Sequence, residues 1–343
     1  MRIPPVQLRR ISCECRGEPM ADNKAESLAP TSHKAKYLRR FEGILITDLF
    51  EESRLRSAFR YEPRDDDVFV VGFPKTGTTW LHFVLQRVVN RASETPAQSA
   101  AACLLNAAFL DFVGGEKIEK LSRTSGLPLV IKTHLPFEKV RFSDKSRYVY
   151  VLRNPYDTCV SYYHNVQQKA PGCSDMTFDD FFEQFIDGWI HPNDYFDHLA
   201  SWFAHRARPN FLCITYEDMK RDPRSGIQKI AAFIGKEISD DAALDEIVQT
   251  VSPDFMKRAF AEAFSARQQE KSIKGSPPNG ASGDSFDGAS KLKGGSHIRK
   301  ATVGDWKNHF SASQIERMKA KMASKTASFR TDLEALWKDA NLP

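Results

Sequence analysis

The sequence predicts an α/β fold: a single P-loop-like domain with a central parallel sheet flanked by helices. Three observations predict it. Continuous apolar runs rich in β-branched residues, typical of strands buried on both faces, recur along the chain. Each run is followed by polar loop residues and then by a helical segment, and strands that alternate with helices form parallel sheets. The first run leads directly into a glycine-containing loop.

The strands are predicted in order from these runs. VFVVGF (68 to 73) is the first, and Trp80 to Val89 then carry apolar residues at helical spacing. LVIKTH (129 to 134), RYVYVLRN (147 to 154) and FLCITYED (211 to 218) repeat the strand pattern. Because a parallel sheet binds its ligands beyond the carboxyl ends of its strands, the polar residues at these ends are the candidates for a site.

Two aromatic stripes and a capping box predict further helices. Aromatic residues at helical spacing over 178–189 and 195–203 favour core packing. The tail opens with Ser311 and Gln314 at the spacing of a capping box, which predicts a C-terminal helix.

The chain divides into an extension and one domain. Residues 1–35 are polar and without period, so we expect a disordered N-terminal extension before a domain over 36–343. Residues 275–296 are of low complexity and predict a flexible, lid-like loop over about 264–298, which is either a dispensable insertion or a lid over a site.

Composition excludes several classes of protein. The chain has 343 residues and a net charge of +5. Its basic residues are distributed along the chain rather than clustered in runs, which favours local anion sites over a nucleic-acid surface. Six cysteines without a CxxC pair suit free thiols better than disulfides or a zinc site. No apolar window is long enough for a membrane span or a signal core. We therefore expect a cytoplasmic protein that binds neither nucleic acid nor membrane, and no metal.

The stretch VGFPKTGTTW predicts a phosphate-binding loop. Gly72 and Gly77 have the spacing of G-x-x-x-x-G-K-[ST], but Thr78 occupies the lysine position and the cation, Lys75, lies inside the loop. Backbone N–H groups at the start of a helix favour an anion, and Thr78 and Thr79 add hydroxyl donors. A plain glycine turn is the alternative. The missing lysine weakens the interpretation as a metal-dependent nucleoside triphosphatase.

KTHLP ends another predicted strand with Lys132 and His134 at positions i and i+2, on one side of the backbone. A histidine can take a proton near neutral pH. Taken alone, His134 is more simply explained as a hydrogen-bonded strand-end residue. Beside a phosphate loop, we expect it to be a general base.

Basic residues at two other places predict a second anion site. Arg153 closes a strand and Ser161 lies eight residues on, whereas Arg299 and Lys300 follow the predicted loop. Arginine binds phosphate as a fork and lysine as a point charge. One anion at the first loop and a separate phosphate at the arginines describe a nucleotide phosphorylated at both ends.

Five motifs in order resemble those of the cytosolic sulfotransferases, which transfer a sulfuryl group from 3′-phosphoadenosine 5′-phosphosulfate (PAPS) to a hydroxyl or amine. FPKTGTTW (73 to 80) is similar to the family's phosphosulfate loop, and KTHLP to its catalytic strand. RNPYD with VSYYH (153 to 164) resembles its 3′-phosphate motif, YEDMKRDP (216 to 223) an adenine-side segment, and RKATVGDWKNHF (299 to 310) its C-terminal signature. The resemblance covers residues 38 to about 330.

The resemblance implies a role for each matching residue. Lys75 would contact the leaving 5′-phosphate, Lys132 the sulfuryl oxygens, and His134 would be the general base, which makes these three the expected catalytic residues. The donor would be held by Lys75, Thr76, Gly77, Thr78 and Thr79 at the 5′-phosphate, by Arg153, Ser161, Arg299, Lys300 and Ala301 at the 3′-phosphate, and by Trp80, Tyr216 and Ser252 at the adenine.

The resemblance also implies a reaction without a metal. Fixed lysines can stabilise the charge of a sulfuryl group where phosphoryl enzymes recruit Mg²⁺, so PAPS is the expected donor and PAP the product. We expect a small, largely apolar acceptor such as a phenol or steroid, in a pocket lined by Phe109, Phe112, Tyr163 and His164, although core packing explains each phenylalanine equally well. A P-loop kinase-like phosphotransferase and a catalytically silent nucleotide-binding relative are the alternatives.

Three departures from the family pattern bear on binding. Ala301 stands where the family has glycine, which restricts the backbone that approaches the 3′-phosphate. Pro253 stands where an adenine-stacking phenylalanine is expected, and Phe255 is a candidate substitute. The family's dimer segment keeps its charged ends but has a smaller central pair, in Lys307, Ser311, Ala312 and Glu316. Homodimerisation is therefore left open.

Overall fold

The computed structural model describes residues 37–90, 95–104, 108–125, 128–274, 298–338, 340 and 342–343. The predicted extension at 1–35 and the low-complexity stretch at 275–296 lie outside these residues. The predicted loop boundary at 264 needs a correction, because helix α12 (Pro253–Lys274) continues through that position.

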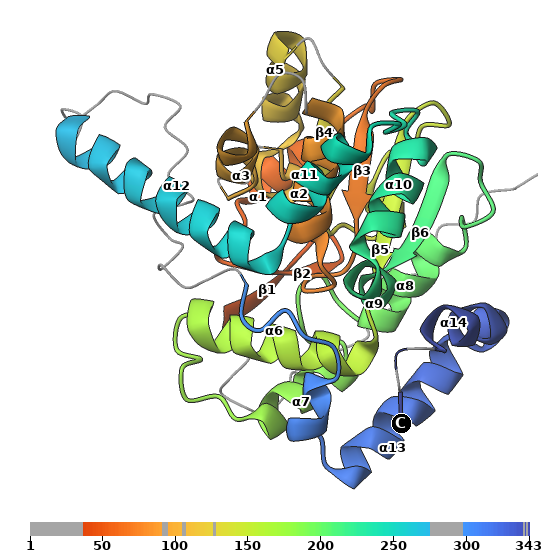
Figure 1. Cartoon of the computed structure of the whole chain (residues 1–343). Helices are drawn as coiled ribbons and strands as arrows, with labels where there is room; N and C mark the ends of the chain where they lie inside the picture. Colours follow the sequence, from red (N-terminus) through yellow and green to blue (C-terminus); the bar gives the residue numbers. More distant parts are fainter. Residues whose placement is uncertain are drawn as a thin grey trace, which may run out of the picture. The chain divides into compact units, whose positions relative to one another are not determined.

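The centre of the described chain is a parallel sheet of four strands (Figure 1). The strands are β3 (Val68–Val71), β4 (Val130–Thr133), β5 (Arg147–Leu152) and β6 (Phe211–Thr215), in the order β4-β3-β5-β6. Each strand lies inside a predicted run, and Val68 pairs with both Val130 and Arg147. The predicted α/β fold is confirmed.

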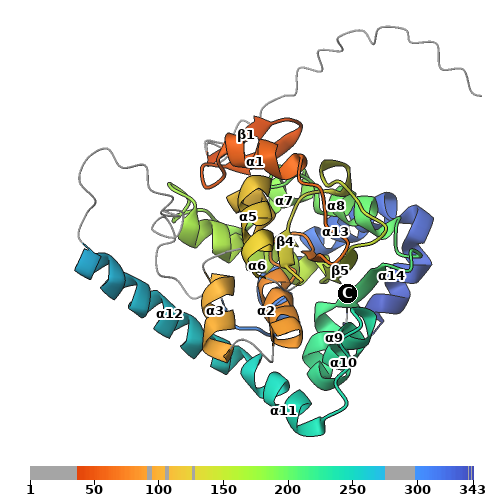
Figure 2. The ribbon, with the colours of Figure 1, turned by 90° about the horizontal axis from the view of Figure 1, so that it is seen from above.

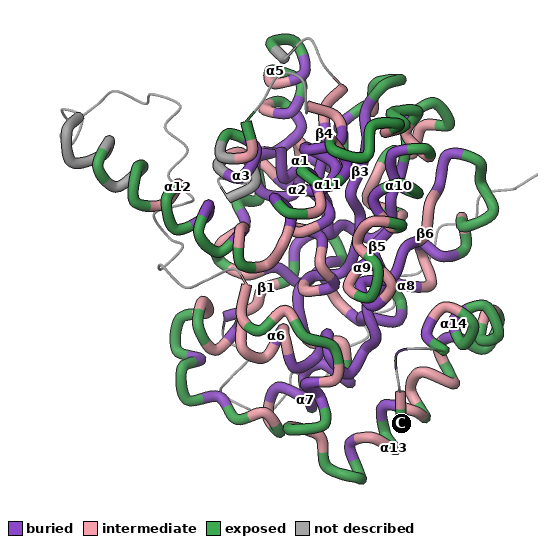
Figure 3. The backbone as a smooth tube through the Cα atoms, viewed as in Figure 1, coloured by how far each residue is buried: buried purple, intermediate pink, exposed green. Residues whose placement is uncertain are grey.

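The sheet is buried on both faces, as its continuous apolar runs predict (Figure 3). Phe69 and Val71 belong to one core cluster, and Val68 and Val70 to the other, because successive side chains of a strand point to opposite faces. Helices α6 (Pro155–Lys169), α7 (Phe178–Ile186) and α8 (Tyr195–Phe203) contribute to the first cluster. Helices α2 (Thr78–Asn90), α10 (Pro223–Phe233) and α11 (Asp241–Thr250) contribute to the second.

The remaining elements surround this layered centre. An antiparallel hairpin, which the sequence did not predict, pairs β1 (Leu38–Phe41) with β2 (Ile44–Thr47). Helix α12 lies alongside α3 (Pro96–Leu104), as Figure 2 shows. The other helices are α1 (Glu52–Phe59), α4 (Leu110–Val113), α5 (Gly115–Ser125), α9 (Tyr216–Arg221), α13 (Ala312–Lys325) and α14 (Arg330–Trp337), with short 3₁₀ turns η2 (Phe137–Lys139), η4 (Asp305–Asn308) and η5 (Ala327–Phe329).

One predicted helix start agrees with the structure, and one predicted helix end differs from it. Helix α13 begins after the capping box of Ser311 and Gln314, which is confirmed. Helix α7 ends at Ile186, before Gly188 with its positive φ of 74°, so Trp189 of the first aromatic stripe lies beyond the helix.

Candidate functional site

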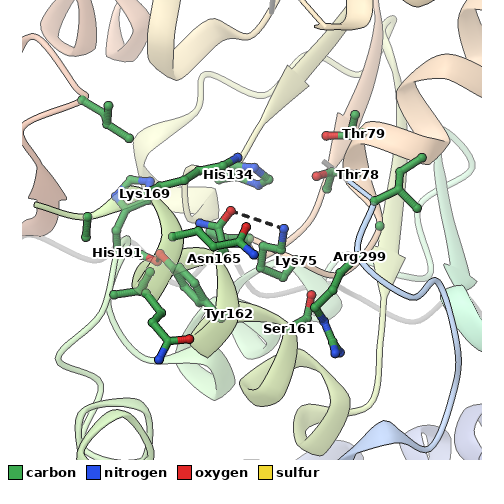
Figure 4. Close-up of a pocket in the computed structure, with 18 of the residues that line it drawn as sticks. Lys75, Thr78, Thr79, His134, Ser161, Tyr162, Asn165, Lys169, His191 and Arg299 are labelled. Atoms are coloured by element: carbon green, nitrogen blue, oxygen red, sulfur yellow. Dashed lines mark hydrogen bonds between the residues drawn. The ribbon is translucent and has the colours of Figure 1, made fainter. Parts of the chain in front are cut away.

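One cavity of about 770 Å³ is lined by residues that follow the carboxyl ends of the sheet strands (Figure 4). Parallel α/β sheets bind their ligands at this edge. The cavity brings together most of the residues that the sequence predicts for the site: Lys75, Gly77, Thr78, Thr79, Trp80, Phe109, Phe112, Lys132, His134, Arg153, Ser161, Tyr216, Arg299, Lys300 and Ala301.

The loop after β3 has the backbone of an anion site. Gly77 has a φ of 107°, and a Cβ atom there would lie 2.7 Å from Cδ2 of Tyr216, so only glycine fits. Lys75 is also left-handed, with a φ of 75°, which costs roughly 1–2 kcal/mol for a residue with a side chain. Such strain is concentrated at functional sites. Thr78 begins α2, whose first N–H groups have no partner within the helix and can bind an anion.

Lys75 lies among other cations. Its Nζ donates to Asn165 Oδ1 at 3.4 Å, and within the described residues no carboxylate forms an ion pair with it. The pKa of Lys75 is lowered to about 7 by burial and then by the charges of Lys169, Arg153, Lys132 and Arg299. A group of like charges favours the binding of an anion among them, since the anion offsets their repulsion and favours the charged form of Lys75.

His134 is oriented by its two hydrogen bonds to the backbone and to an acid. The Nδ1–H group donates to the Gly72 carbonyl at 2.6 Å, and the backbone N–H donates to Asp111 Oδ2 at 2.8 Å. The first bond places the lone pair on Nε2. Burial, followed by the charge of Lys132, holds the pKa of His134 well below its usual value. The ring is therefore neutral at pH 7, as a general base must be.

The end of β4 is held by Asp111. This buried carboxylate accepts from Thr133 Oγ1 at 2.5 Å as well as from the His134 N–H, and burial raises its pKa to about 6. Lys132 precedes Thr133 in β4, and its Nζ lies 4.0 Å from the centroid of the Phe109 ring. A cation over a ring face is attracted to it, which positions the ammonium in the cavity wall.

Arg153 connects the phosphate loop to the segment 298–302. Its guanidinium donates to the carbonyl oxygens of Lys75 at 3.3 Å and Thr302 at 3.0 Å, and lies 4.4 Å from the ring centroid of Tyr216. Its Nε atom is buried without a hydrogen-bond partner in the described chain. A buried donor without an acceptor costs about 1–3 kcal/mol, so an anionic ligand fits this position.

Arg299 and Lys300 share one acid. Arg299 donates to Asp305 Oδ2 at 2.5 Å and Lys300 donates to Oδ1 at 2.8 Å. Burial opposes ionisation of Asp305, but the hydrogen bonds from Lys300 and Arg299 outweigh it and lower the pKa of this carboxyl. The charged carboxylate therefore holds both cations at the cavity, which Ser161 also lines from α6.

Asp157 fixes the course of the same C-terminal segment. It is buried in the first turn of α6 and accepts from the N–H groups of Gly304 at 2.7 Å and Trp306 at 3.1 Å. Upstream of these bonds, Ala301 has a φ of 57°. The resemblance predicts glycine at this left-handed position. The chain forms the turn with alanine instead, at a cost in backbone strain.

Two of the three residues predicted to contact an adenine line the cavity, and Ser252 does not. The rings of Trp80 and Tyr216 meet edge to face at 5.5 Å, and both line the cavity. Pro253 lines the cavity where a stacking phenylalanine is expected, whereas Phe255 does not. Ser252 lies outside the lining and instead caps α12, since its Oγ accepts from the Phe255 N–H at 3.3 Å.

Three further predicted residues are not brought to the cavity. Thr76 is buried behind the loop, and its N–H and Oγ1 both donate to the Phe73 carbonyl, at 3.2 and 2.8 Å. Tyr163 donates to the Met176 carbonyl at 3.2 Å, and the ring of His164 packs on that of Tyr163. Helix α6 has 3.6 residues per turn, so Tyr163 and His164 lie on a different face from Ser161. Their side chains therefore point away from the cavity.

The cavity also contains residues that the sequence analysis missed. Asn165 and Lys169 follow Ser161 at intervals of four residues on α6, so the helical spacing from a predicted phosphate ligand could have found them. Phe50 and His191 line the cavity with ring centroids 4.3 Å apart. They come from segments far apart in the sequence, and no local pattern marks them.

The wall fits a ligand with anions at two ends. Asp48 is the one acidic residue in the described lining, and it is 76% exposed and lies 3.8 Å from Arg39 Nε. Phosphate and sulfate groups bring negative charges that match an excess of cations. The lining cations are Lys75, Lys132, Arg153, Lys169, Lys220, Arg299 and Lys300.

Comparison with known proteins agrees with this chemistry. Residues 65–330 match the sulfotransferase domain family. The amine sulfotransferase of Oryctolagus cuniculus is 31% identical over 286 residues, covering 82% of this chain and 88% of the relative. Sulfotransferase 1C2 of Homo sapiens is 30% identical over 294 residues, covering 82% and 89%. The crystal structure of mouse sulfotransferase SULT7A1 complexed with PAP has a TM-score of 0.68 and 27% identity, covering 88% of this chain and 98% of that one.

The family match covers most of the chain, and the fold agrees with that of a relative solved with PAP. The cation-lined cavity fits such a nucleotide. This chain therefore belongs to the cytosolic sulfotransferase family and is a PAPS-dependent sulfotransferase.

Proposed function

We propose that this enzyme moves the sulfuryl group of PAPS to the hydroxyl or amine of a small, largely apolar acceptor by in-line transfer, with His134 as the general base. The observation that carries the proposal is the bond from His134 Nδ1 to the Gly72 carbonyl at 2.6 Å. It leaves Nε2 as the nitrogen that can take a proton, in a cavity that Lys75 and Lys132 also line.

The donor is held by two groups of residues. The first turn of α2, with Thr78 and Thr79, binds the 5′ end, while Trp80 and Tyr216 contact the adenine. The 3′-phosphate is bound by Arg153, Ser161, Arg299 and Lys300, near the left-handed turn at Ala301. Two observations support this division: all of these residues line one cavity, and the Arg153 Nε atom is a buried donor without an acceptor among the described residues.

The transfer itself needs a proton acceptor and fixed positive charge. When bound, PAPS supplies an activated sulfuryl group, whose bond to the phosphate oxygen breaks as the acceptor's oxygen or nitrogen bonds to sulfur. His134 Nε2 takes the proton that the acceptor loses. Lys75 donates to the phosphate oxygen that keeps the electron pair, and Lys132 donates to the sulfuryl oxygens. Preorganised donors of this kind meet the developing charge without reorganising.

An apolar acceptor is favoured by the aromatic wall beside His134. The rings of Phe109 and Phe112 are stacked with centroids 6.1 Å apart, and Phe50 meets them edge-on at 6.3 and 6.2 Å. All three line the cavity. Apolar walls with a few directed polar groups are typical of small-molecule sites.

The expectations about partners and location follow the same proposal. We expect a cytoplasmic enzyme that acts on small molecules and binds neither nucleic acid nor membrane. Within the residues that the structure describes, no helix is long and apolar enough to cross a membrane. Homodimerisation stays open, because the matching segment keeps only its charged ends, Lys307 and Glu316.

The alternatives are reduced by the family assignment. Membership of the sulfotransferases removes the P-loop kinase interpretation. A catalytically silent nucleotide-binding protein would have no need to keep Lys75, Lys132 and His134 in one cavity.

Replacement of the general base tests the proposal. We expect His134→Ala to lower kcat by about 10²- to 10⁴-fold, because general base catalysis contributes that much. The stabilisation of the protein by PAP in a thermal-shift assay should persist, since the donor residues are untouched. His205→Ala, outside the cavity, is the matched control. Near-normal turnover by His134→Ala would exclude His134 as the base.

A further inference from the structure

We propose that Lys169 determines acceptor specificity, and that the preferred acceptor is a hydroxy acid with an apolar body, whose carboxylate pairs with Lys169 while its hydroxyl faces His134. This inference rests on the proposed function and names the substrate class of the same site.

Helix α6 runs along the cavity from one end to the other. Ser161, Asn165 and Lys169 line the cavity at intervals of four residues, so they share one face of the helix. A rise of 1.5 Å per residue places the Cα of Lys169 about 12 Å beyond that of Ser161 along the axis. Asn165, midway, accepts from Lys75 Nζ at 3.4 Å. Lys169 therefore lies one helical turn past the residue that holds the lysine of the transfer site.

The close-up of the cavity agrees with this order. Figure 4 shows Thr79 and Arg299 on one side of the cavity and Lys169 and His191 on the other, with His134 between them. The donor is expected at the first side, since its phosphate ligands are there. Lys169 thus belongs to the side from which the acceptor approaches.

Lys169 is a cation without an acidic partner. The described residues provide it with no ion pair and no hydrogen bond, and Asp48, the acid in the described lining, is exposed and lies beside Arg39. Burial lowers the pKa of Lys169, as expected for an ammonium group removed from water. Lys75, in contrast, has Asn165 as a hydrogen-bond partner.

Lys169 is half-buried, and an ammonium group partly removed from water without a partner is costly; a carboxylate on the ligand offsets that cost. A neutral phenol or steroid would leave Lys169 unpaired. The neighbouring lining residues Phe50, Phe112 and His191 supply the wall for an apolar or aromatic body. The acceptor class that satisfies both features is an apolar hydroxy acid.

Lys169 could instead be a third cation on the transferred sulfuryl group, because its charge acts on Lys75. The two roles predict different kinetics. A cation on the sulfuryl group would serve every acceptor equally, whereas an acceptor-binding cation would distinguish a carboxylate from its neutral ester.

The test uses a matched pair of acceptors, 3-(4-hydroxyphenyl)propanoate and its methyl ester. The ratio of their kcat/KM values is measured with PAPS for the wild type, Lys169→Met and Lys169→Glu. The dissociation constant of the acid for the protein–PAP complex is measured by calorimetry for each. Lys220→Met is the charge-matched control, since Lys220 lines the cavity at its adenine end, with Nζ 5.9 Å from the centroid of the Trp80 ring.

We expect the wild type to prefer the acid, and Lys169→Met to lower the acid-to-ester ratio by about 10- to 100-fold, as for a charged hydrogen bond. Lys169→Glu should lower it further, and Lys220→Met should leave it within about twofold. The inference is overturned if Lys169→Met leaves the ratio unchanged, if both acceptors lose activity equally, or if the wild type prefers the ester. Lys169-dependent binding of the acid without any transfer from PAPS would instead contradict only the proposed function.

Discussion

Lys75 shows at the scale of one residue how the cavity is prepared for an anion. Its backbone is left-handed and its ammonium group lies among four other cations, and both conditions cost free energy in the protein alone. Both are understandable if a polyanion completes the site. The low pKa of Lys75, about 7, is then a property of the ligand-free protein that binding reverses.

Because the bound anion would raise the pKa of Lys75, we predict that the protein takes up a proton when it binds PAP. At pH 8 the free Lys75, with its pKa lowered to about 7, is mostly neutral, and the bound anion raises that pKa towards its usual value. Uptake should therefore approach one proton, and PAP affinity should fall as the pH rises above 7. Calorimetry at pH 8 in two buffers with different ionisation enthalpies measures the uptake. Lys75→Met should abolish it, and equal heats in both buffers for the wild type would refute the prediction.

Ala301 predicts a stabilising substitution. Ala301→Gly removes the left-handed strain of roughly 1–2 kcal/mol, but glycine costs about 0.5–1 kcal/mol in chain entropy. We expect a net gain of roughly 0.5–1 kcal/mol in the free energy of unfolding, measured by urea denaturation. Ala320→Gly, an exposed position inside α13, should lose about 0.5–1 kcal/mol instead. A loss at both positions would mean that Ala301 is not strained.

At this scale most residues predicted for the donor line the cavity, whereas only two of the four predicted for the acceptor do so. Lys75, Lys132 and Arg153 are marked because each lies at the end of a recognisable strand. Tyr163 and His164 do not line the cavity, because neighbours of Ser161 in the sequence point in other directions on a helix.

At the scale of elements, α6 organises the site. It lines the cavity along its length, and Asp157 in its first turn holds the segment that carries Arg299 and Lys300. If Arg299 and Lys300 bind the donor as proposed, one carboxylate links donor binding to the position of the C-terminal segment.

Asp157→Asn should weaken PAP binding. The amide keeps one acceptor oxygen, but its NH₂ group faces a backbone donor, and the loss of a charged hydrogen bond costs about 1.5–3 kcal/mol. Arg299 and Lys300 would lose their fixed position, so we expect the dissociation constant of PAP to rise by at least about tenfold in calorimetry. Asp218→Asn, which breaks only the exposed pair with Arg221, should change little. Wild-type affinity in Asp157→Asn would refute the linkage.

The elements that the sequence missed have weak local signals. Strands β1 and β2 are four residues each, and LRRF alternates too little to show a half-buried face. The end of α12 was misjudged because residues 264–274 have helix-forming side chains without an apolar period. The strands of the sheet were found because burial on both faces makes them continuously apolar.

At the scale of the whole described molecule, the site depends on packing between distant segments. The two core clusters on the faces of the sheet fix the strand ends, and these ends carry residues that we propose to bind the donor. Phe50 and His191 reach the cavity from segments far apart in the sequence, so the sequence predicts the reaction but not the acceptor.

Fixed cations, rather than a divalent ion, are proposed to balance the charge of the donor and of the moving sulfuryl group. The most direct test measures sulfuryl transfer from ³⁵S-labelled PAPS, in excess EDTA, by the wild type and by Lys75→Met. We expect the wild type to keep its full rate under chelation, and Lys75→Met to lose about 10²- to 10³-fold, as when one preorganised donor is removed. Loss of wild-type transfer in EDTA, or an undiminished rate in Lys75→Met, would contradict it.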